Sequence, residues 1–292
     1  MLEVRNRLDK MIGMAPVKAQ VDDLITNALV DRSRREQGLP AEESTMHMVF
    51  SGPPGTGKTT VADEMGELYH ALGVVKSPKV VKPRISDLIG EYQGETHSKT
   101  QRVLDSAHGG VLFIDEAYGL ASDKHGGGAY GREALNTIVD DMEKHRGDSV
   151  VILAGYPREI EQLIKINPGL RSRLPTTIHF PAYTPKASVQ IAHKMASEGG
   201  YTLDKPARRA LGQALSALPE DAKGNAREIR NLYERTRKAH ARRLLTEHPA
   251  GDIPREAHEV LTAADIAAGA AAYHSTRLTA RPARLVKKPV NA

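Results

Sequence analysis

Residues 46–60 have the sequence MHMVFSGPPGTGKTT. A short apolar run from Met46 to Phe50 leads into Gly52-Pro53-Pro54-Gly55-Thr56-Gly57-Lys58-Thr59, which fits the pattern G-x-x-x-x-G-K-[ST]. Such a loop places backbone N–H groups and the amino-terminal end of a helix around phosphate groups. The stretch therefore predicts a strand, a phosphate-binding loop and a helix from Lys58 to about Leu72. The alternative is an ordinary glycine turn before a helix.

Strands and helices alternate on both sides of this loop. Apolar spacing predicts helices at Val17–Arg35, Thr96–Ala107 and Arg132–Lys144, and extended segments at Lys79–Lys82, Val111–Ile114 and Val150–Ala154. Four consecutive apolar residues, as in VLFI at 111–114, are typical of a parallel strand that is covered on both faces. This pattern predicts an α/β fold with a parallel, doubly wound sheet.

The pattern changes after Phe180 and Pro181, where only helices are predicted: Pro185–Glu198, Lys205–Leu218, Asn225–Leu245 and Thr262–Tyr273. Thr262-Ala263-Ala264-Asp265 has the form of a capped helix start. We therefore expect an α/β nucleotide-binding domain at 1–181, a small all-helical domain at 182–274 and a basic, disordered tail at 275–292.

Composition limits the possible classes of protein. The chain has 292 residues, enough for two domains, and contains no cysteine. We found no signal-peptide pattern and no apolar run long enough to span a bilayer, so a cytoplasmic protein is expected. The net charge of +5 comes from the last sixteen residues, which hold Arg277, Arg281, Arg284, Lys287 and Lys288. Residues 1–276 are therefore neutral overall, which argues against a broad nucleic-acid surface. An anion-binding arm remains an alternative for the tail.

Two adjacent acids follow the apolar run at 111–114. In an open parallel sheet the carboxyl end of such a strand lies beside the phosphate loop. Asp115 is expected to hold Mg²⁺ together with the Thr59 hydroxyl, and Glu116 to orient and deprotonate an attacking water. Lys58 is expected to contact the β and γ phosphates of ATP. The alternative is that the two acids only mark the end of a strand and have no role in catalysis.

These motifs resemble the CbxX/CfqX family of AAA+ ATPases, which includes red-type rubisco activases and the ATPase domain of EccA secretion chaperones. The resemblance covers roughly residues 8–245. Besides the phosphate loop, it rests on Ile12-Gly13, Leu88-Ile89-Gly90-Glu91-Tyr92-Gln93-Gly94-Glu95-Thr96, Gly110 through Tyr118, Tyr130-Gly131-Arg132-Glu133, Ala154-Gly155-Tyr156, Asn167 through Arg173, and Gly224-Asn225-Ala226-Arg227. The family implies a P-loop AAA+ fold followed by a helical lid.

The resemblance also implies roles for individual residues. Arg171 and Arg173 match the segment whose arginine reaches the γ-phosphate of a neighbouring subunit, with Arg173 preferred. Arg227 matches the sensor-2 arginine of the lid, and Tyr156 stands at the sensor-1 position, where many AAA+ proteins have Asn or Thr. Ile12 and Gly13 belong to the implied nucleotide site.

Tyr92-Gln93-Gly94 resembles the aromatic pore loop with which ring ATPases grip a polypeptide. An exposed aromatic side chain on a glycine-flanked loop suits that task. A buried Tyr92 is the alternative, and Gln93 departs from the aliphatic residue usual at the centre of the motif. His125–Gly128 is either a second pore loop or a disordered turn.

Together these features predict a homo-hexameric, Mg²⁺-dependent ATPase that remodels an unidentified protein partner. A head-to-tail contact that closes into a ring would bring arginines of one subunit to the ATP of the next. The alternatives are a nucleic-acid-associated loader, a small-molecule P-loop kinase, and a binding module that uses ATP as a switch.

Overall fold

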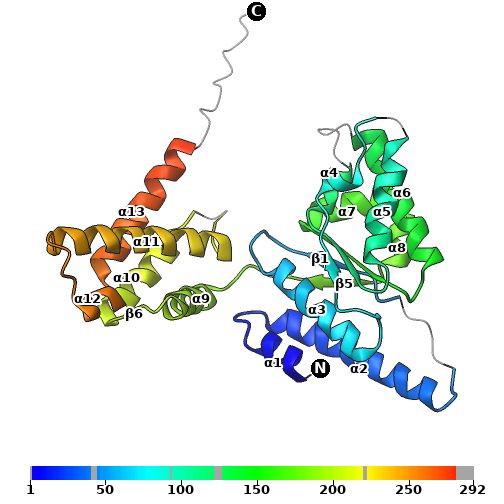
Figure 1. Cartoon of the computed structure of the whole chain (residues 1–292), viewed down its shortest axis with the longest axis horizontal. Coiled ribbons are helices and arrows are strands. Elements are labelled where there is room, and N and C mark those ends of the chain that lie inside the picture. The colour runs from blue at the N-terminus through cyan, green and yellow to red at the C-terminus, as the bar shows by residue number, and fades with distance from the viewer. Residues whose placement is uncertain (1, 41–44, 93, 122–126, 220–221, 281–292) are drawn as a thin grey trace, which may run out of the picture. The chain divides into compact units, whose positions relative to one another are not determined.

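The structure is a computed structural model, which describes residues 2–40, 45–92, 94–121, 127–219 and 222–280 (Figure 1). Contacts divide the chain into two compact units, Met1–Ala182 and a second unit from Tyr183 onward. This division lies one residue from the boundary expected from the sequence. None of the helices in the described ranges combines the length and the apolarity needed to cross a bilayer.

The first unit is built on a sheet of five parallel strands in the order β2-β3-β4-β1-β5. The strands are β1 (Met48–Ser51), β2 (Val80–Val81), β3 (Val111–Ile114), β4 (Val150–Gly155) and β5 (Thr176–His179). Every residue of β1, β3 and β4 is buried, as their unbroken apolar sequences predict. The doubly wound parallel sheet is thereby confirmed.

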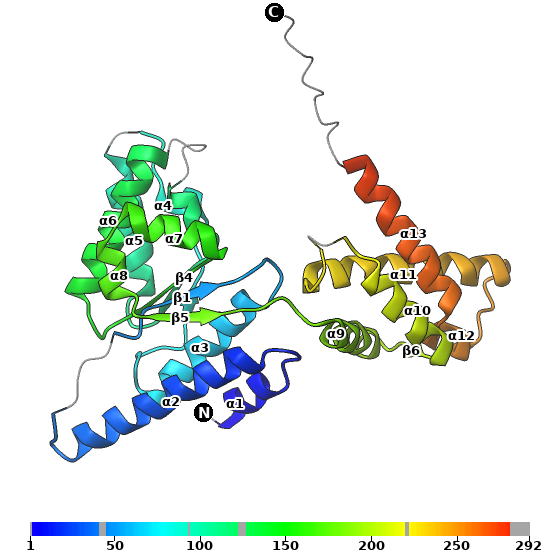
Figure 2. The same cartoon turned by 180° about the vertical axis from the view of Figure 1, so that it is seen from behind.

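Helices cover both faces of this sheet, as Figures 1 and 2 show. One face carries α1 (Leu2–Asp9), α2 (Ala15–Glu36) and α3 (Lys58–Leu72). The other carries α4 (Ile85–Leu88), α5 (Glu95–Ala107), α6 (Gly127–Lys144), α7 (Pro157–Ile166) and α8 (Gly169–Arg173). A short 3-10 helix, η1 (Ala117–Ala121), follows β3 and packs against α6 and α7.

Alternate side chains of the strands enter two separate cores. Val49, Leu112, Ile114 and Leu153 pack with the residues of α5 to α8. The three phenylalanines of the chain are all buried, and the Phe50 ring pairs with both others: its centroid is 6.3 Å from that of Phe113 and 4.9 Å from that of Phe180. Because these rings come from β1, β3 and the end of β5, they tie together segments that are distant in the sequence.

The described part of the second unit contains five helices: the four that the sequence predicts, and a short one at residues 255–259 that it does not predict. There is also one addition outside the helices. The helices are α9 (Pro185–Glu198), α10 (Lys205–Ser216), α11 (Ala226–Glu247), α12 (Arg255–Glu259) and α13 (Ala263–Ala280). The addition is a two-residue parallel pair, β6 (Thr202–Leu203) with β7 (Val260–Leu261). Strands this short have no apolar periodicity from which they could be predicted.

Helix α13 continues past the predicted end at Tyr273 to Ala280, so residues 275–280 are helical rather than part of the tail. The physical reason is a contact with α11: the Arg235 guanidinium donates to the Ala272 carbonyl at 3.2 Å and to the Thr276 hydroxyl at 3.0 Å. Residues 281–292, the remainder of the expected tail, lie outside the described residues.

The start of α13 has the predicted cap. The Thr262 hydroxyl accepts from the Asp265 N–H at 3.3 Å, while the Asp265 carboxylate accepts from the Thr262 N–H at 2.9 Å. This reciprocal pair satisfies two backbone donors that would otherwise lack partners. Asp265, 2% exposed, also accepts from the Arg243 guanidinium at 2.9 Å, which fixes α13 to α11.

Candidate nucleotide site

The phosphate loop connects the carboxyl end of β1 to the first turn of α3. Gly55 and Gly57 have positive φ values of 66° and 89°, a conformation that glycine adopts without strain. Lys58 is 8% exposed, and its amine donates to the Gly52 carbonyl at 2.9 Å and the Pro53 carbonyl at 2.7 Å. The loop thus folds around its own lysine, and phosphate oxygens could replace these carbonyls as acceptors.

Thr59 and Asp115 meet as the sequence predicts. The Thr59 hydroxyl donates to the Asp115 carboxylate at 3.3 Å, although 55 residues separate them in the chain. The contact joins the start of α3 to the end of β3, across the carboxyl edge of the sheet. A hydroxyl and a carboxylate are hard oxygen donors of the kind that Mg²⁺ prefers, so these two side chains fit the implied ion.

Glu116 has an unusual backbone. Its φ of 50° is the one positive value at a residue other than glycine in the described part of the chain. Its N–H donates to the Asp115 carboxylate at 3.0 Å, and its side chain is exposed. A non-glycine residue in this region costs on the order of 1–2 kcal/mol. Strain of this kind tends to occur at functional positions, where surrounding structure maintains it.

Two tyrosines lie beside this acid. The Tyr118 ring, in η1, packs against the Tyr156 ring with 5.8 Å between centroids. Burial, followed by the negative charge of Glu116 and a hydrogen bond to it, raises the pKa of Tyr118 to about 12. The phenol is therefore protonated at neutral pH and donates to the Glu116 carboxylate. Sequence reasoning gave Tyr118 no role, although its position two residues after Glu116 in a 3-10 turn was the available signal.

The two candidate finger arginines differ in their surroundings. Arg173 is half-buried: its guanidinium donates to the Gly169 carbonyl at 3.0 Å and pairs with Glu143 at 3.1 Å. Its Nε is buried and has no hydrogen-bond partner among the residues that the structure describes. Arg171, two residues earlier on α8, is exposed. The geometry thus ties Arg173 to α6 of its own subunit and leaves Arg171 at the surface.

The candidate pore loop precedes α5. The Tyr92 side chain is 70% exposed, which excludes the alternative of a core tyrosine. Gly94 has a φ of 86° and directly precedes α5. The Glu95 carboxylate accepts from the N–H groups of Glu91 and Tyr92 at 3.2 and 3.3 Å, which ties these two residues to the start of α5. Gln93 lies outside the described residues, as do His125 and Gly126 of the second candidate loop, whereas Gly127 and Gly128 form the start of α6.

The remaining predicted nucleotide contacts lie further along the chain. Ile12 and Gly13 form the turn between α1 and α2, with a φ of 73° at Gly13. Arg227 is an exposed residue in the first turn of α11, and its N–H donates to the Asn225 side chain at 2.9 Å. It belongs to the second unit, so its role toward a nucleotide stays a prediction.

Comparisons with known proteins agree with this geometry. Residues 48–182 match the model of the ATPase family associated with various cellular activities (AAA), and residues 187–277 match an AAA lid domain. The AAA domain of FIGL-1, solved in complex with ADP, has the same fold: the TM-score is 0.59 at 17% identity, over 87% of this chain and 80% of that one. The chain therefore has the fold and the domain order of the AAA class of ATPases.

Relatives define the branch within that class. The chromosomal protein CbxX of Cupriavidus necator is 41% identical over 84% of this chain and 78% of its own length. The ESX-1 secretion system protein EccA1 of Mycolicibacterium smegmatis is 35% identical over 94% of this chain, which spans 50% of that relative. The chain belongs to the CbxX-type AAA+ ATPases.

Proposed function

We propose that this protein hydrolyses ATP to ADP and phosphate with Mg²⁺ bound, in a homo-hexameric ring that remodels a protein partner. The observation that carries the proposal is the 3.3 Å contact between Thr59 and Asp115. It brings the phosphate loop and the acid pair of β3 to one edge of the sheet, where ligands of open α/β sheets bind.

Each residue of the site has a distinct task in this proposal. The Lys58 amine exchanges the Gly52 and Pro53 carbonyls for phosphate oxygens. Thr59 and Asp115 would hold Mg²⁺, which would supply positive charge to the phosphates. Glu116 takes a proton from the attacking water, because its carboxylate is exposed at the same edge.

Tyr118 positions Glu116 for this step. Its hydroxyl donates to the carboxylate, and its ring is held against Tyr156. Tyr156 thereby acts in the sensor-1 position by packing, not by contacting water.

A neighbouring subunit supplies the remaining positive charge. The exposure of Arg171 supports it as the residue that reaches the neighbour's γ-phosphate, while Arg173 fixes α8 to α6 through Glu143. This reverses the preference for Arg173 expected from the sequence. A finger of this kind contributes on the order of 10³-fold or more to the rate.

The partner is proposed to be a protein. The 70% exposure of Tyr92, which the Glu95 carboxylate ties to the start of α5, supports a gripping role for its ring. Tyr92→Ala should therefore leave basal ATP hydrolysis unchanged while abolishing stimulation of that hydrolysis by an added partner. Loss of basal activity in this variant would contradict the role.

The test of the ring is phosphate release measured across a series of protein concentrations. Activity per subunit should rise with concentration in the wild type. Glu116→Gln and Arg171→Ala should each lower it by at least about 100-fold while nucleotide binding persists. Arg102→Ala, which removes another exposed arginine of the first unit, is the matched control and should retain activity.

Mixing the two inactive variants gives a sharper result. A site formed between an Arg171→Ala subunit and a Glu116→Gln neighbour can contain one intact glutamate and one intact arginine. Activity should therefore reappear in the mixture if sites are shared between subunits. No recovery, in mixtures verified to assemble, refutes the shared site. A wild type silent at every concentration would favour an ATP-binding switch, and the search would move to partners retained by Glu116→Gln.

A further inference from the structure

Three side chains with metal-binding atoms converge at the edge of the sheet opposite the candidate nucleotide site. His108 directly follows α5, and Asp141 and His145 lie one turn apart at the end of α6. Strands β3 and β4 begin just beyond them, at Val111 and Val150, so the cluster lies at the amino-terminal edge of the strands. The site already described lies at their carboxyl edge.

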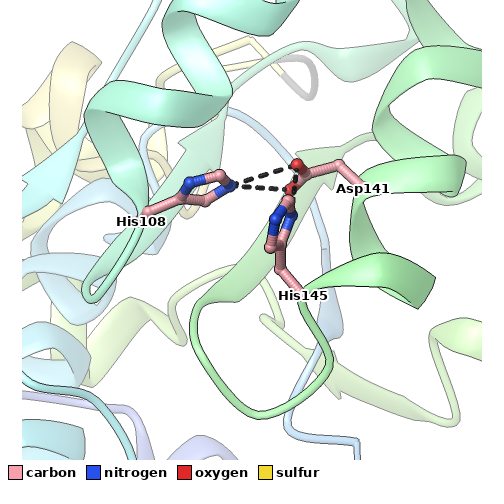
Figure 3. Close-up of side chains that lie close together, drawn as sticks. All are labelled: His108, Asp141 and His145. Atoms are coloured by element: carbon pink, nitrogen blue, oxygen red, sulfur yellow. Dashed lines mark hydrogen bonds and ion pairs between the residues drawn. The ribbon is translucent and has the colours of Figure 1, made fainter.

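The three side chains point toward one another, as Figure 3 shows. His108 Nε2 is 3.1 Å and His145 Nδ1 is 2.8 Å from the same oxygen of Asp141. All three candidate donor atoms lie within 4.8 Å of one another. Donors around a tetrahedral zinc ion, with bonds of about 2.0–2.1 Å, are about 3.3 Å apart. Small rotations of the two rings would therefore make room for an ion.

The surroundings favour a cation. Asp141 is 3% exposed, so its carboxylate has little contact with water and depends on nearby partners. Helices α5 and α6 both end at the cluster, and the carboxyl end of a helix carries partial negative charge. Asp148 adds a second carboxylate close by: its N–H donates to the His145 carbonyl at 3.0 Å, and its carboxylate pairs with Lys76 at 2.5 Å.

A third histidine, His47, lies close by, but its ring nitrogens bond to other groups. His47 Nδ1 accepts from the Val151 N–H at 3.0 Å, and the ring also donates to the Met142 carbonyl. The cluster thus offers two imidazoles and one carboxylate, with a further coordination position for water. The rings of His108 and His145 are half-exposed, so a metal ion in solvent can reach the cluster on their side.

We propose that His108, Asp141 and His145 bind a divalent transition metal of the zinc class, which links the end of α5 to the end of α6. Nitrogen and carboxylate donors in this number suit Zn²⁺, with Co²⁺ as a spectroscopic substitute. The link is structural, and it is independent of the proposed ATPase. In the absence of metal, the histidines hydrogen-bond to Asp141 and hold the same segments together more weakly.

The test is calorimetric titration of the full, metal-stripped and tag-free chain with Zn²⁺. The wild type should bind one equivalent, and His108→Asn and His145→Asn should each weaken it by at least about tenfold. Asparagine can still donate to Asp141, so the fold is expected to persist, which circular dichroism checks. Because the chain has 12 histidines, the exposed His179→Asn serves as a matched control that should bind like the wild type.

A second measurement needs no variant. One equivalent of Co²⁺ should give the intense visible absorption of a four-coordinate site, and Zn²⁺ should then displace it. The proposal is overturned if the wild type takes up no stoichiometric metal, or if both cluster variants bind Zn²⁺ as tightly as the control. Either result would mean that the cluster is a hydrogen-bonded network only.

Discussion

His47 should make the first unit sensitive to mild acid. Its side chain is 2% exposed, directly before β1, and burial lowers the pKa from 6.5 to about 4. The ring is held neutral because Nδ1 accepts the Val151 N–H, an acceptor role that the imidazolium cannot fill. Asp141 opposes the shift and Arg146 reinforces it, each less than burial does.

The size and sign of the effect follow from proton linkage. Below pH 6.5 the unfolded chain takes up a proton at His47, whereas the folded chain does not do so until about pH 4. The contribution of His47 to the free energy of unfolding is therefore fully present above pH 6.5, and it is lost as the pH falls toward 4. At about 1.4 kcal/mol per pKa unit, the total is about 3 kcal/mol, of which about 2 kcal/mol disappears between pH 7 and pH 5.

The assay is hydrogen exchange of the buried amides of β4 at the two pH values, corrected for intrinsic exchange rates and with a chelator present. These amides report opening of the first unit alone. His47→Asn keeps an acceptor for the Val151 N–H but does not titrate. Between pH 7 and pH 5 the free energy of unfolding should therefore fall by about 2 kcal/mol less in this variant than in the wild type. Equal losses in both proteins, or an imidazole NMR titration of His47 near pH 6.5, would refute the reasoning.

Three substitutions test the packing by thermal unfolding. Gly131→Ala should destabilise by about 3 kcal/mol or more, because its Cβ would lie 1.8 Å from the Leu120 carbonyl oxygen. Gly212→Ala meets nothing within 4 Å inside α10 and should stabilise by about 0.5–1 kcal/mol. A loss in that variant would contradict the open environment. Asp265→Asn should cost about 2–3 kcal/mol, since it removes the buried carboxylate that pairs with Arg243 and leaves that guanidinium only Glu247 as a charged partner; a neutral effect would mean that the buried pair contributes little.

Segments with strong local signals were predictable from the sequence. The ends of α3 at Lys58 and Leu72 and those of α9 at Pro185 and Glu198 coincide with the predicted ones, because a glycine loop, a Pro and flanking glycines mark them. Strand β5 was not predicted. Its sequence is Thr-Thr-Ile-His, and as an edge strand it pairs only with β1, so no continuous apolar run is required.

In the candidate site too, some features were predictable from the sequence and others were not. The phosphate loop and the acids at 115 and 116 were identified because each is a contiguous motif whose chemistry depends on spacing. The pairing of Tyr118 with Tyr156 depends on where β4 lies relative to β3, which no local pattern encodes. The Asp141 and His145 spacing of one helical turn was a visible signal, but His108 joins them only through the tertiary fold.

The left-handed backbone at Glu116 has a consequence for protein engineering. Glycine would relieve the strain there, so Glu116→Gly should raise thermal stability by about 1 kcal/mol. Directed evolution for heat resistance alone would then enrich a variant that lacks the carboxylate needed for turnover. The position is a trade-off between activity and stability, so libraries built for robustness should keep codon 116 fixed.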